Sequence, residues 1–169
     1  MKEVTVMSKT YRVTPFVKLS NRITSTMLRA GLSFNSMNLL TVPGRKSGEP
    51  RTVPVSVLKR DGERYLIGAF GEVNWVRNLR AAGRGTLRLG RVVEDFTSVE
   101  LTPPEAAPIL KAGFDMAPGY VRQFFDATPE SSVSDFEREA PRHPVFRLAM
   151  RTPNPEAVDE TRDSALHRR

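Results

Sequence analysis

Short apolar runs separated by tight polar turns fill most of the chain from residue 37 to residue 102. In RTVPVSVLKR the valines share one face, whereas Thr52, Pro54 and Ser56 share the other. This period of two predicts a half-buried strand. Similar runs raise the number of predicted strands to six: residues 37–43, 51–60, 63–70, 85–90, 92–102 and 143–150.

Local signals predict the turns between these strands. Asp61–Gly62 is typical of a two-residue hairpin turn, and Gly90–Arg91 occupies the matching place in a second hairpin. Strands joined in this way lie antiparallel. A capping box from Thr102 to Glu105 then predicts a helix start, with helical or irregular polar segments continuing to about residue 142.

Two further segments have helical signals. Residues 14–31 space their apolar positions as a helix does, with Thr14 as the expected N-cap and Gly31 as the stop. NWVRNLRAAG, residues 74–83, predicts a short helix that begins with Asn74 as its cap. Both helices are expected to flank the strands.

Together these elements predict an α+β fold that is mainly antiparallel β, a small barrel with an N-terminal helix and flanking short helices. The chain lacks the repeated strand–helix–strand units of a Rossmann fold. We expect a single domain over residues 14–151, between a flexible N-terminus, 1–13, and a flexible tail, 152–169.

Composition restricts the chemistry. The chain has no cysteine, which excludes disulfides, thiolate metal sites and cysteine nucleophiles and suits a reducing cytoplasm. Its two histidines and the spacing of its carboxylates predict no metal site. No serine-nucleophile elbow, Walker loop or G-x-G-x-x-G sequence is present. If the protein is an enzyme, a bound cofactor is expected to carry the reaction.

The positive charge lies in the first third of the chain. Residues 1–60 carry eleven Lys and Arg against two Asp and Glu, whereas the remainder carries fifteen against seventeen. This asymmetry predicts an anionic partner: nucleic acid, a membrane surface or a small ligand with phosphates or carboxylates. Nucleic acid is disfavoured, because no exposed aromatics alternate with the cations. Peripheral membrane contact through residues 14–31 stays open, beside simple packing of that helix on the barrel.

The turn PGRKSGEPR, residues 43–51, is the main candidate binding element. It contains three cations, Arg45, Lys46 and Arg51. Gly44 and Gly48 lie on either side of the first two. The glycines would allow a concave nest of N–H groups, and Ser47 adds a hydroxyl, so the turn is expected to bind a phosphate or carboxylate. A solvated loop that keeps the protein soluble is the alternative interpretation.

The elements next to this turn suggest a surface for a flat ligand. Pro54 has no N–H, so its strand cannot form a continuous hydrogen-bond ladder, and the small side chains beside it would let a flat ring lie against the backbone. An edge strand that its proline protects from aggregation is the alternative. Trp75 and Asn78 share one face of the following helix. Trp75 is by default a core residue, whereas Asn78 needs a partner, either loop backbone or a ligand.

The sequence LTVPGRKSGEPRTVPVSVLKRDGERYLIGAFG, followed by NWVRNLRAAG, strongly resembles the deazaflavin-dependent nitroreductase family over about residues 38–90. The resemblance implies a split β-barrel that binds the deazaflavin coenzyme F-420 rather than FMN. It implies that the turn grips the phosphate and nearby tail, that two strands support the ring, and that the short helix lies beside it. The implied cofactor-binding residues are Arg45, Lys46, Ser47, Gly48, Arg51, Pro54, Val55, Ser56, Ala69, Phe70, Gly71, Trp75 and Asn78.

The resemblance also implies an oxidoreductase that passes hydride from reduced F-420 to an apolar small-molecule acceptor such as a quinone, an enone or a nitro compound. No catalytic side chain is assigned. The alternative is a non-catalytic split-barrel carrier of a flavin, haem, lipid or deazaflavin. We expect a cytoplasmic protein, with membrane association left open, and a homodimer as the expected assembly, because related split barrels usually pair.

Overall fold

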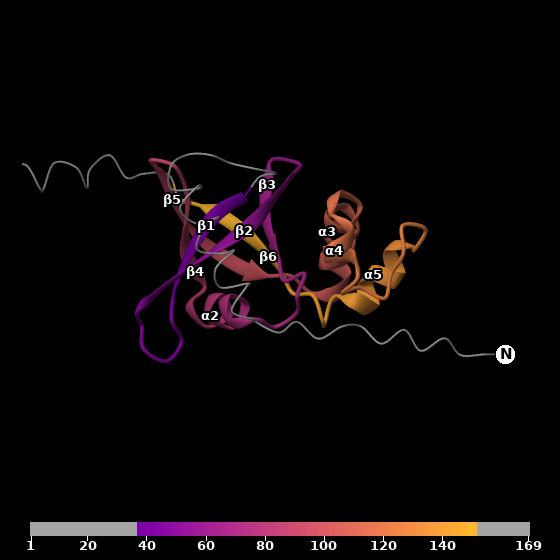
Figure 1. Cartoon of the computed structure of the whole chain (residues 1–169), viewed down its shortest axis with the longest axis horizontal. Coiled ribbons are helices and arrows are strands. Elements are labelled where there is room, and N and C mark those ends of the chain that lie inside the picture. The colour runs from indigo at the N-terminus through magenta and orange to yellow at the C-terminus, as the bar shows by residue number, and fades with distance from the viewer. Residues whose placement is uncertain (1–36, 152–169) are drawn as a thin grey trace, which may run out of the picture.

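The computed structural model describes residues 37–151. Within this range six strands form a closed antiparallel barrel in the order β1-β2-β3-β6-β5-β4 (Figure 1). The strands are β1 (Met37–Pro43), β2 (Pro50–Arg60), β3 (Glu63–Ile67), β4 (Arg84–Leu89), β5 (Val92–Glu100) and β6 (Val145–Met150). The predicted mainly antiparallel α+β barrel is confirmed. The predicted flexible ends and the predicted helix 14–31 lie outside the described residues.

The hairpins form where the dipeptides place them. Asp61 and Gly62 both have positive φ, 52° and 79°, and join β2 to β3, while Gly90, with φ 59°, begins the turn from β4 to β5. Positive φ at both central residues gives a turn whose twist matches that of the flanking strands. This turn fixes the register of β2 against β3, in which Arg60 pairs with Glu63.

The valines of β2 face inward as their alternation predicts. Val55 and Val57 are buried in the barrel core, which also holds Leu40, Leu66 and Phe96 and other apolar residues. Thr52 and Ser56 on the opposite face are exposed. The alternation therefore determines which face of β2 is turned toward the barrel interior.

Helix α2 (Asn74–Ala82) crosses one end of the barrel and buries Val76 and Leu79 in its core. It ends as predicted, because Gly83 takes the left-handed conformation that glycine accepts without strain. The predicted cap is wrong. Val73 occupies the N-cap position without a side-chain cap bond, and Asn74 is the first helical residue, with its amide turned to the β1–β2 turn.

Three helices gather on one side of the barrel beside β3 and β6: α3 (Pro103–Met116), α4 (Gly119–Arg122) and α5 (Val133–Glu139) (Figure 1). The capping box at Thr102 and Glu105 is present, with the Glu105 carboxylate 2.9 Å from the Thr102 backbone N–H. This region is less polar than predicted, since Leu110, Phe114 and Phe136 form a second buried core. No helix among residues 37–151 is long and apolar enough to cross a membrane.

Candidate active site

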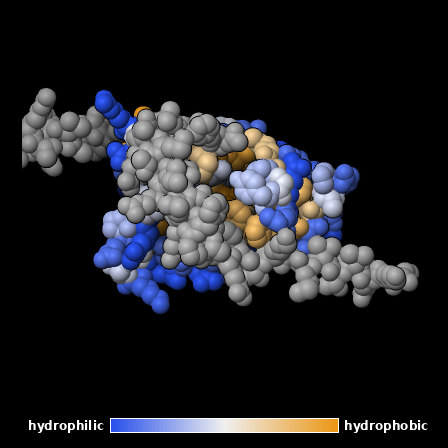
Figure 2. Space-filling model, viewed as in Figure 1, coloured by the Kyte–Doolittle hydropathy of each residue, from blue (hydrophilic) through white to orange (hydrophobic). Residues whose placement is uncertain are grey.

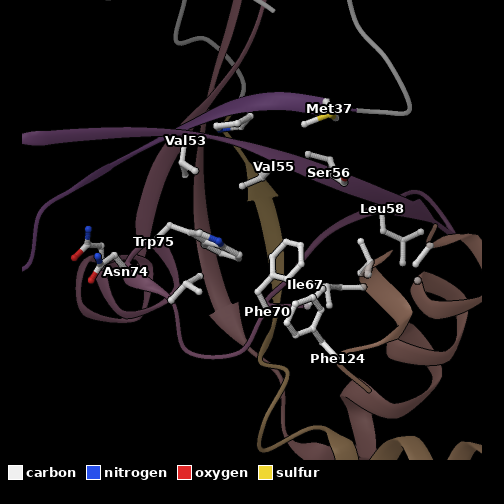
Figure 3. Close-up of a pocket in the computed structure, with 18 of the residues that line it drawn as sticks. Met37, Val53, Val55, Ser56, Leu58, Ile67, Phe70, Asn74, Trp75 and Phe124 are labelled. Atoms are coloured by element: carbon white, nitrogen blue, oxygen red, sulfur yellow. The ribbon is translucent and has the colours of Figure 1, made fainter. Parts of the chain in front are cut away.

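A cavity of about 1410 Å³ lies between the barrel and the α3–α4 segment. Its walls come from the β1–β2 turn, β2, the end of β3, the first turns of α2, and α3 with α4. Figure 2 shows hydrophobic residues gathered in a hollow on this face of the molecule, and Figure 3 shows the side chains that project into the space. Segments distant in sequence therefore meet at one site.

Most of the predicted cofactor-binding residues line this cavity. Eleven of the thirteen do so: Arg45, Lys46, Ser47, Arg51, Pro54, Val55, Ser56, Ala69, Phe70, Trp75 and Asn78. Gly48 and Gly71 do not. Both have positive φ, 71° and 80°, so their role in the structure is to allow turns.

Neither glycine contributes its own N–H group to the predicted nest. Gly44 N–H donates to the Glu49 carbonyl at 2.8 Å, and Gly48 N–H donates to the Gly44 carbonyl at 2.7 Å. Both donors are consumed inside the turn, so they are not directed at a ligand. The cationic side chains of the turn, Arg45, Lys46 and Arg51, line the cavity and can bind an anion.

Asn78 organises the first of these side chains. The residue is only 5% exposed, and its Oδ1 accepts hydrogen bonds from Arg45 Nη1 at 2.9 Å and from the Arg45 backbone N–H at 3.3 Å. The buried amide thus bonds the loop, one of the two alternatives that the sequence left. Because Asn78 is neutral, it orients the guanidinium while leaving its full positive charge for a ligand.

Arg51 has a different partner. Its Nη2 lies 3.0 Å from the Glu49 carboxylate in an exposed ion pair, and Lys46 beside them is exposed. Among the described residues the cavity lining contains Arg45, Lys46 and Arg51 but no Asp, Glu or His. Glu49 reaches this cluster from outside the lining. One end of the cavity is therefore cationic and suited to phosphate or carboxylate groups.

The arginines of α2 add little positive charge to the cavity. Arg80 donates to Glu100 at 2.6 and 2.8 Å and to Glu72 at 2.6 Å, and Arg77 lies 3.9 Å from Glu72. The hydrogen bond and charge of Arg80 lower the pKa of Glu72. These groups neutralise one another and fix α2 to β5, so the cations available to a ligand are those of the β1–β2 turn.

The cavity meets both faces of β2. The alternation of β2 predicted core positions for its valines, and the resemblance added only Val55 to the ligand site. Figure 3 shows instead that Val53 and Val55 point toward Trp75 across the space, and all three line it. Trp75 is half-buried and packs against the barrel core with its ring 6.2 Å from that of Phe146. The indole is thus both a core residue and a cavity wall.

Sequence reasoning missed the opposite wall, which α3 and α4 supply. Leu110, Gly113, Phe114, Val121 and Phe124 line the cavity there. A signal was present, because Ala106, Leu110 and Phe114 recur at the spacing of four that marks one face of a helix. Apolar and polar residues are about equally frequent between residues 103 and 142, so composition alone does not mark this wall as apolar.

A buried carboxylate holds the segment behind this wall. Glu139 Oε1 accepts from the backbone N–H groups of Asp126 and Ala127 at 2.8 and 2.9 Å, and Arg142 Nη2 lies 2.7 Å from Oε2. Burial raises the pKa of Glu139, but His143, the charge of Arg142 and the Ala127 N–H outweigh it, so its pKa is lower than usual. His143 stacks on Phe125 at a ring distance of 3.8 Å and so connects this cluster to the lining.

Comparison with known proteins gives a family. A family model described as F420H(2)-dependent quinone reductase matches residues 17–127. A solved structure described as a domain-swapped dimer is 21% identical, covers 80% of this chain and all of its own, and superimposes with a TM-score of 0.51. A solved F420-H2 dependent reductase is 23% identical over 68% of this chain and 94% of its own, with a TM-score of 0.48. The family match confirms the predicted deazaflavin-dependent oxidoreductase.

Proposed function

Because the chain belongs to the F420H(2)-dependent quinone reductase family, we propose that its cavity binds coenzyme F-420 and a quinone side by side. The observation that carries the proposal is the polarity of the cavity. At one end the cavity is lined by three cationic side chains and by no carboxylate of the described residues. The rest of its lining is mainly aromatic and aliphatic. This arrangement suits a ligand with an anionic tail and a flat apolar ring.

The residues fit the coenzyme as follows. Arg45, Lys46 and Arg51, with the Ser47 hydroxyl, would bind its phosphate and acidic tail. The β2 segment at Pro54 and the end of β3 would support its ring. When bound, reduced F-420 supplies a hydride, which a quinone takes up with one proton to become a quinol. Among the described residues no Asp, Glu or His lines the cavity, and the source proposed for that proton is water.

The part of the protein itself is orientation and exclusion of water. The Asn78–Arg45 contact fixes a cation, and the aromatic side chains of Phe70, Trp75 and Phe124 reduce the polarity around the reacting rings. Two reactants held in contact react as if at high effective concentration. This function requires no catalytic acid from the described residues.

Titration with F-420 tests the proposal. The wild-type protein should give saturable binding that weakens as salt rises, because the contacts are ionic. Arg51→Ala should weaken binding by about 1.5–3 kcal/mol, the range for hydrogen bonds to charged groups. Arg91→Ala removes the same charge from an exposed turn outside the cavity and should bind normally. Absence of binding at low salt would reject the proposal.

We expect a homodimer, because a structural neighbour is described as a domain-swapped dimer and β5 exposes Val92, Val93 and Val99. Light scattering after gel filtration measures this directly. The sequence pattern alone leaves peripheral membrane contact through residues 14–31 open, beside packing of that segment on the barrel. Flotation with anionic vesicles, with and without residues 1–32, tests it.

A further inference from the structure

A second, smaller space lies at the base of the β1–β2 turn, outside the barrel. We call it the outer pocket, and its volume is about 300 Å³. Because side chains alternate along a strand and Leu40, Leu87 and Phe96 belong to the barrel core, the residues next to them on β1, β4 and β5 point away from that core. We define the outer pocket by six of its lining residues: Thr41, Gly48, Arg84, Thr86, Asp95 and Arg151.

The outer pocket adjoins the cationic end of the main cavity, the one proposed to hold the coenzyme. Thr52 lines the main cavity and Thr41 lines the outer pocket, and their Oγ1 atoms lie 2.8 Å apart in a hydrogen bond. The β1–β2 turn borders both spaces, since Arg45 lines the first and Gly48 lines the second. One turn and one hydrogen-bonded pair of hydroxyl groups therefore separate the two spaces.

A row of polar side chains leads from the main cavity to the outer pocket. In the register of the sheet, four residues lie opposite one another from β2 to β5: Thr52, Thr41, Thr86 and Asp95. Neighbouring strands lie about 5 Å apart, so the row spans about 14 Å, the length of roughly four extended residues. Hydroxyl groups along this row can donate hydrogen bonds to carboxylates.

Two cations lie beside the end of this row. Arg84 and Arg151 are exposed, and within residues 37–151 neither forms an ion pair, whereas Arg80 on the adjacent helix pairs with two carboxylates. The backbone of each is fixed. Arg84 lies opposite Thr97 in the β4–β5 ladder, and the Arg151 N–H donates to the Asp95 carbonyl at 2.8 Å. Both guanidinium groups are thus available for bidentate contacts with carboxylates.

Asp95 opposes these cations, as the acidic residue in the described lining of the outer pocket. Two positive charges then stand against one negative charge, so a separate small anion is expected to bind weakly. A carboxylate tethered to a ligand in the main cavity would bind at a high effective concentration, which compensates for the weak attraction. The outer pocket therefore suits the continuation of an anchored ligand better than a free anion.

We propose that the outer pocket binds carboxylates of the oligoglutamate tail of the coenzyme, so that the protein prefers F-420 with several tail glutamates over F-420 with one. The inference rests on the proposed function, because the ring and the phosphate must occupy the main cavity for the tail to reach the outer pocket. It assigns recognition of the tail to Arg84 and Arg151, in addition to the cations of the β1–β2 turn.

Titration with two forms of the coenzyme tests the outer pocket without turnover. Trp75 is the only tryptophan of the chain and lines the main cavity, so its fluorescence reports binding of the ring of either form. F-420 with five tail glutamates should bind at least fivefold tighter than F-420 with one. The difference should shrink as salt rises, because the contacts are ionic. Equal affinities at low salt would overturn the inference.

Variants that remove charge separate contacts in the outer pocket from general attraction to a basic protein. Arg84→Gln and Arg151→Gln should each reduce the five-to-one affinity ratio at least twofold, while the affinity for the one-glutamate form stays at the wild-type value. Arg147→Gln removes the same charge from an exposed residue of β6 outside both spaces and should keep the wild-type ratio. A ratio unchanged in both outer-pocket variants, or lowered equally by the control, would overturn the inference.

The acidic residue of the outer pocket gives a test of opposite sign. Asp95→Asn keeps the size of the side chain and removes its negative charge, so the five-to-one affinity ratio should rise about twofold. A ratio that falls in this variant would contradict a carboxylate ligand and overturn the inference.

The one-glutamate form distinguishes failure of the outer pocket from failure of the proposed function. If both forms bind with the same affinity, the outer-pocket inference fails and the coenzyme site in the main cavity stands. If neither form binds at low salt, the proposed function fails, and the inference about the tail is overturned with it.

Discussion

The carboxamide oxygen of Asn78, on α2, accepts hydrogen bonds from both the backbone N–H and the guanidinium of Arg45 in the β1–β2 turn. One buried neutral group thus fixes the loop and directs its cation into the cavity. The helix that closes the barrel core is in this way connected to the residue proposed to bind the coenzyme.

Replacing Asn78 separates these two roles. Asn78→Ala leaves the Arg45 N–H without its partner, so the free energy of unfolding should fall by about 1–3 kcal/mol, and F-420 should bind more weakly. Asn78→Asp keeps an acceptor, but its carboxylate pairs with the guanidinium, so stability should fall less while F-420 affinity still falls. Denaturant unfolding and F-420 titration measure both effects. Wild-type affinity in Asn78→Asp would show that the Arg45 charge is not used.

The Glu49–Arg51 ion pair predicts a variant that binds more tightly. Glu49 withdraws Arg51 from a ligand and adds negative charge beside the site. Because both side chains are exposed, the pair is weak, and Glu49→Gln should tighten F-420 binding by about two- to fivefold. Glu63→Gln removes an equal charge from an exposed residue outside the cavity and is the control. Weaker binding in Glu49→Gln would mean that Glu49 instead positions Arg51 for the ligand.

The barrel was predictable because its signals are local. Alternation in β2 sets which side chains are buried, and Asp61–Gly62 sets the hairpin and so the register of its strands. Each signal lies within a few residues of the structure that it specifies. The same holds for the capping box at Thr102 and for Gly83 at the end of α2.

The remaining features depend on contacts between distant segments. Asn is a residue type that commonly caps helices, but the Oδ1 of Asn74 accepts instead from the guanidinium of Arg45, 29 positions away, at 3.5 Å. Gly44 and Gly48 do not contribute to the predicted nest for a related reason, since they use their N–H groups to close the turn. The wall from Leu110 to Phe124 depends on where α3 docks, which no local pattern specifies. The cofactor-binding roles of the lining residues remain predictions.

Closure of the barrel predicts a steric limit at Gly85 on β4. A Cβ there would lie 2.8 Å from the Thr41 carbonyl oxygen and 3.0 Å from Phe96 Cζ, and the Thr41 backbone cannot easily move within the sheet. Gly85→Ala should therefore destabilise the protein by about 1–3 kcal/mol through overpacking. Gly119→Ala, at a position with open space, is the matched control. Equal denaturation midpoints for the two variants would show that β1 and β4 separate without cost.

The Glu139 cluster predicts an acid-sensitive segment behind the wall that α3 and α4 supply. Because the pKa of Glu139 is lower in the folded protein than in the unfolded chain, its ionisation stabilises the fold above its ordinary pKa. That contribution is lost as pH falls through the folded pKa, below the ordinary value of about 4.5. Glu139→Gln should therefore cost about 1–3 kcal/mol at pH 7, and the difference from wild type should shrink at pH 3–4. Glu137→Gln, exposed on the same helix, should show no such convergence. Urea unfolding at several pH values measures the difference, and a gap that stays constant from pH 7 to pH 3 would contradict the assignment.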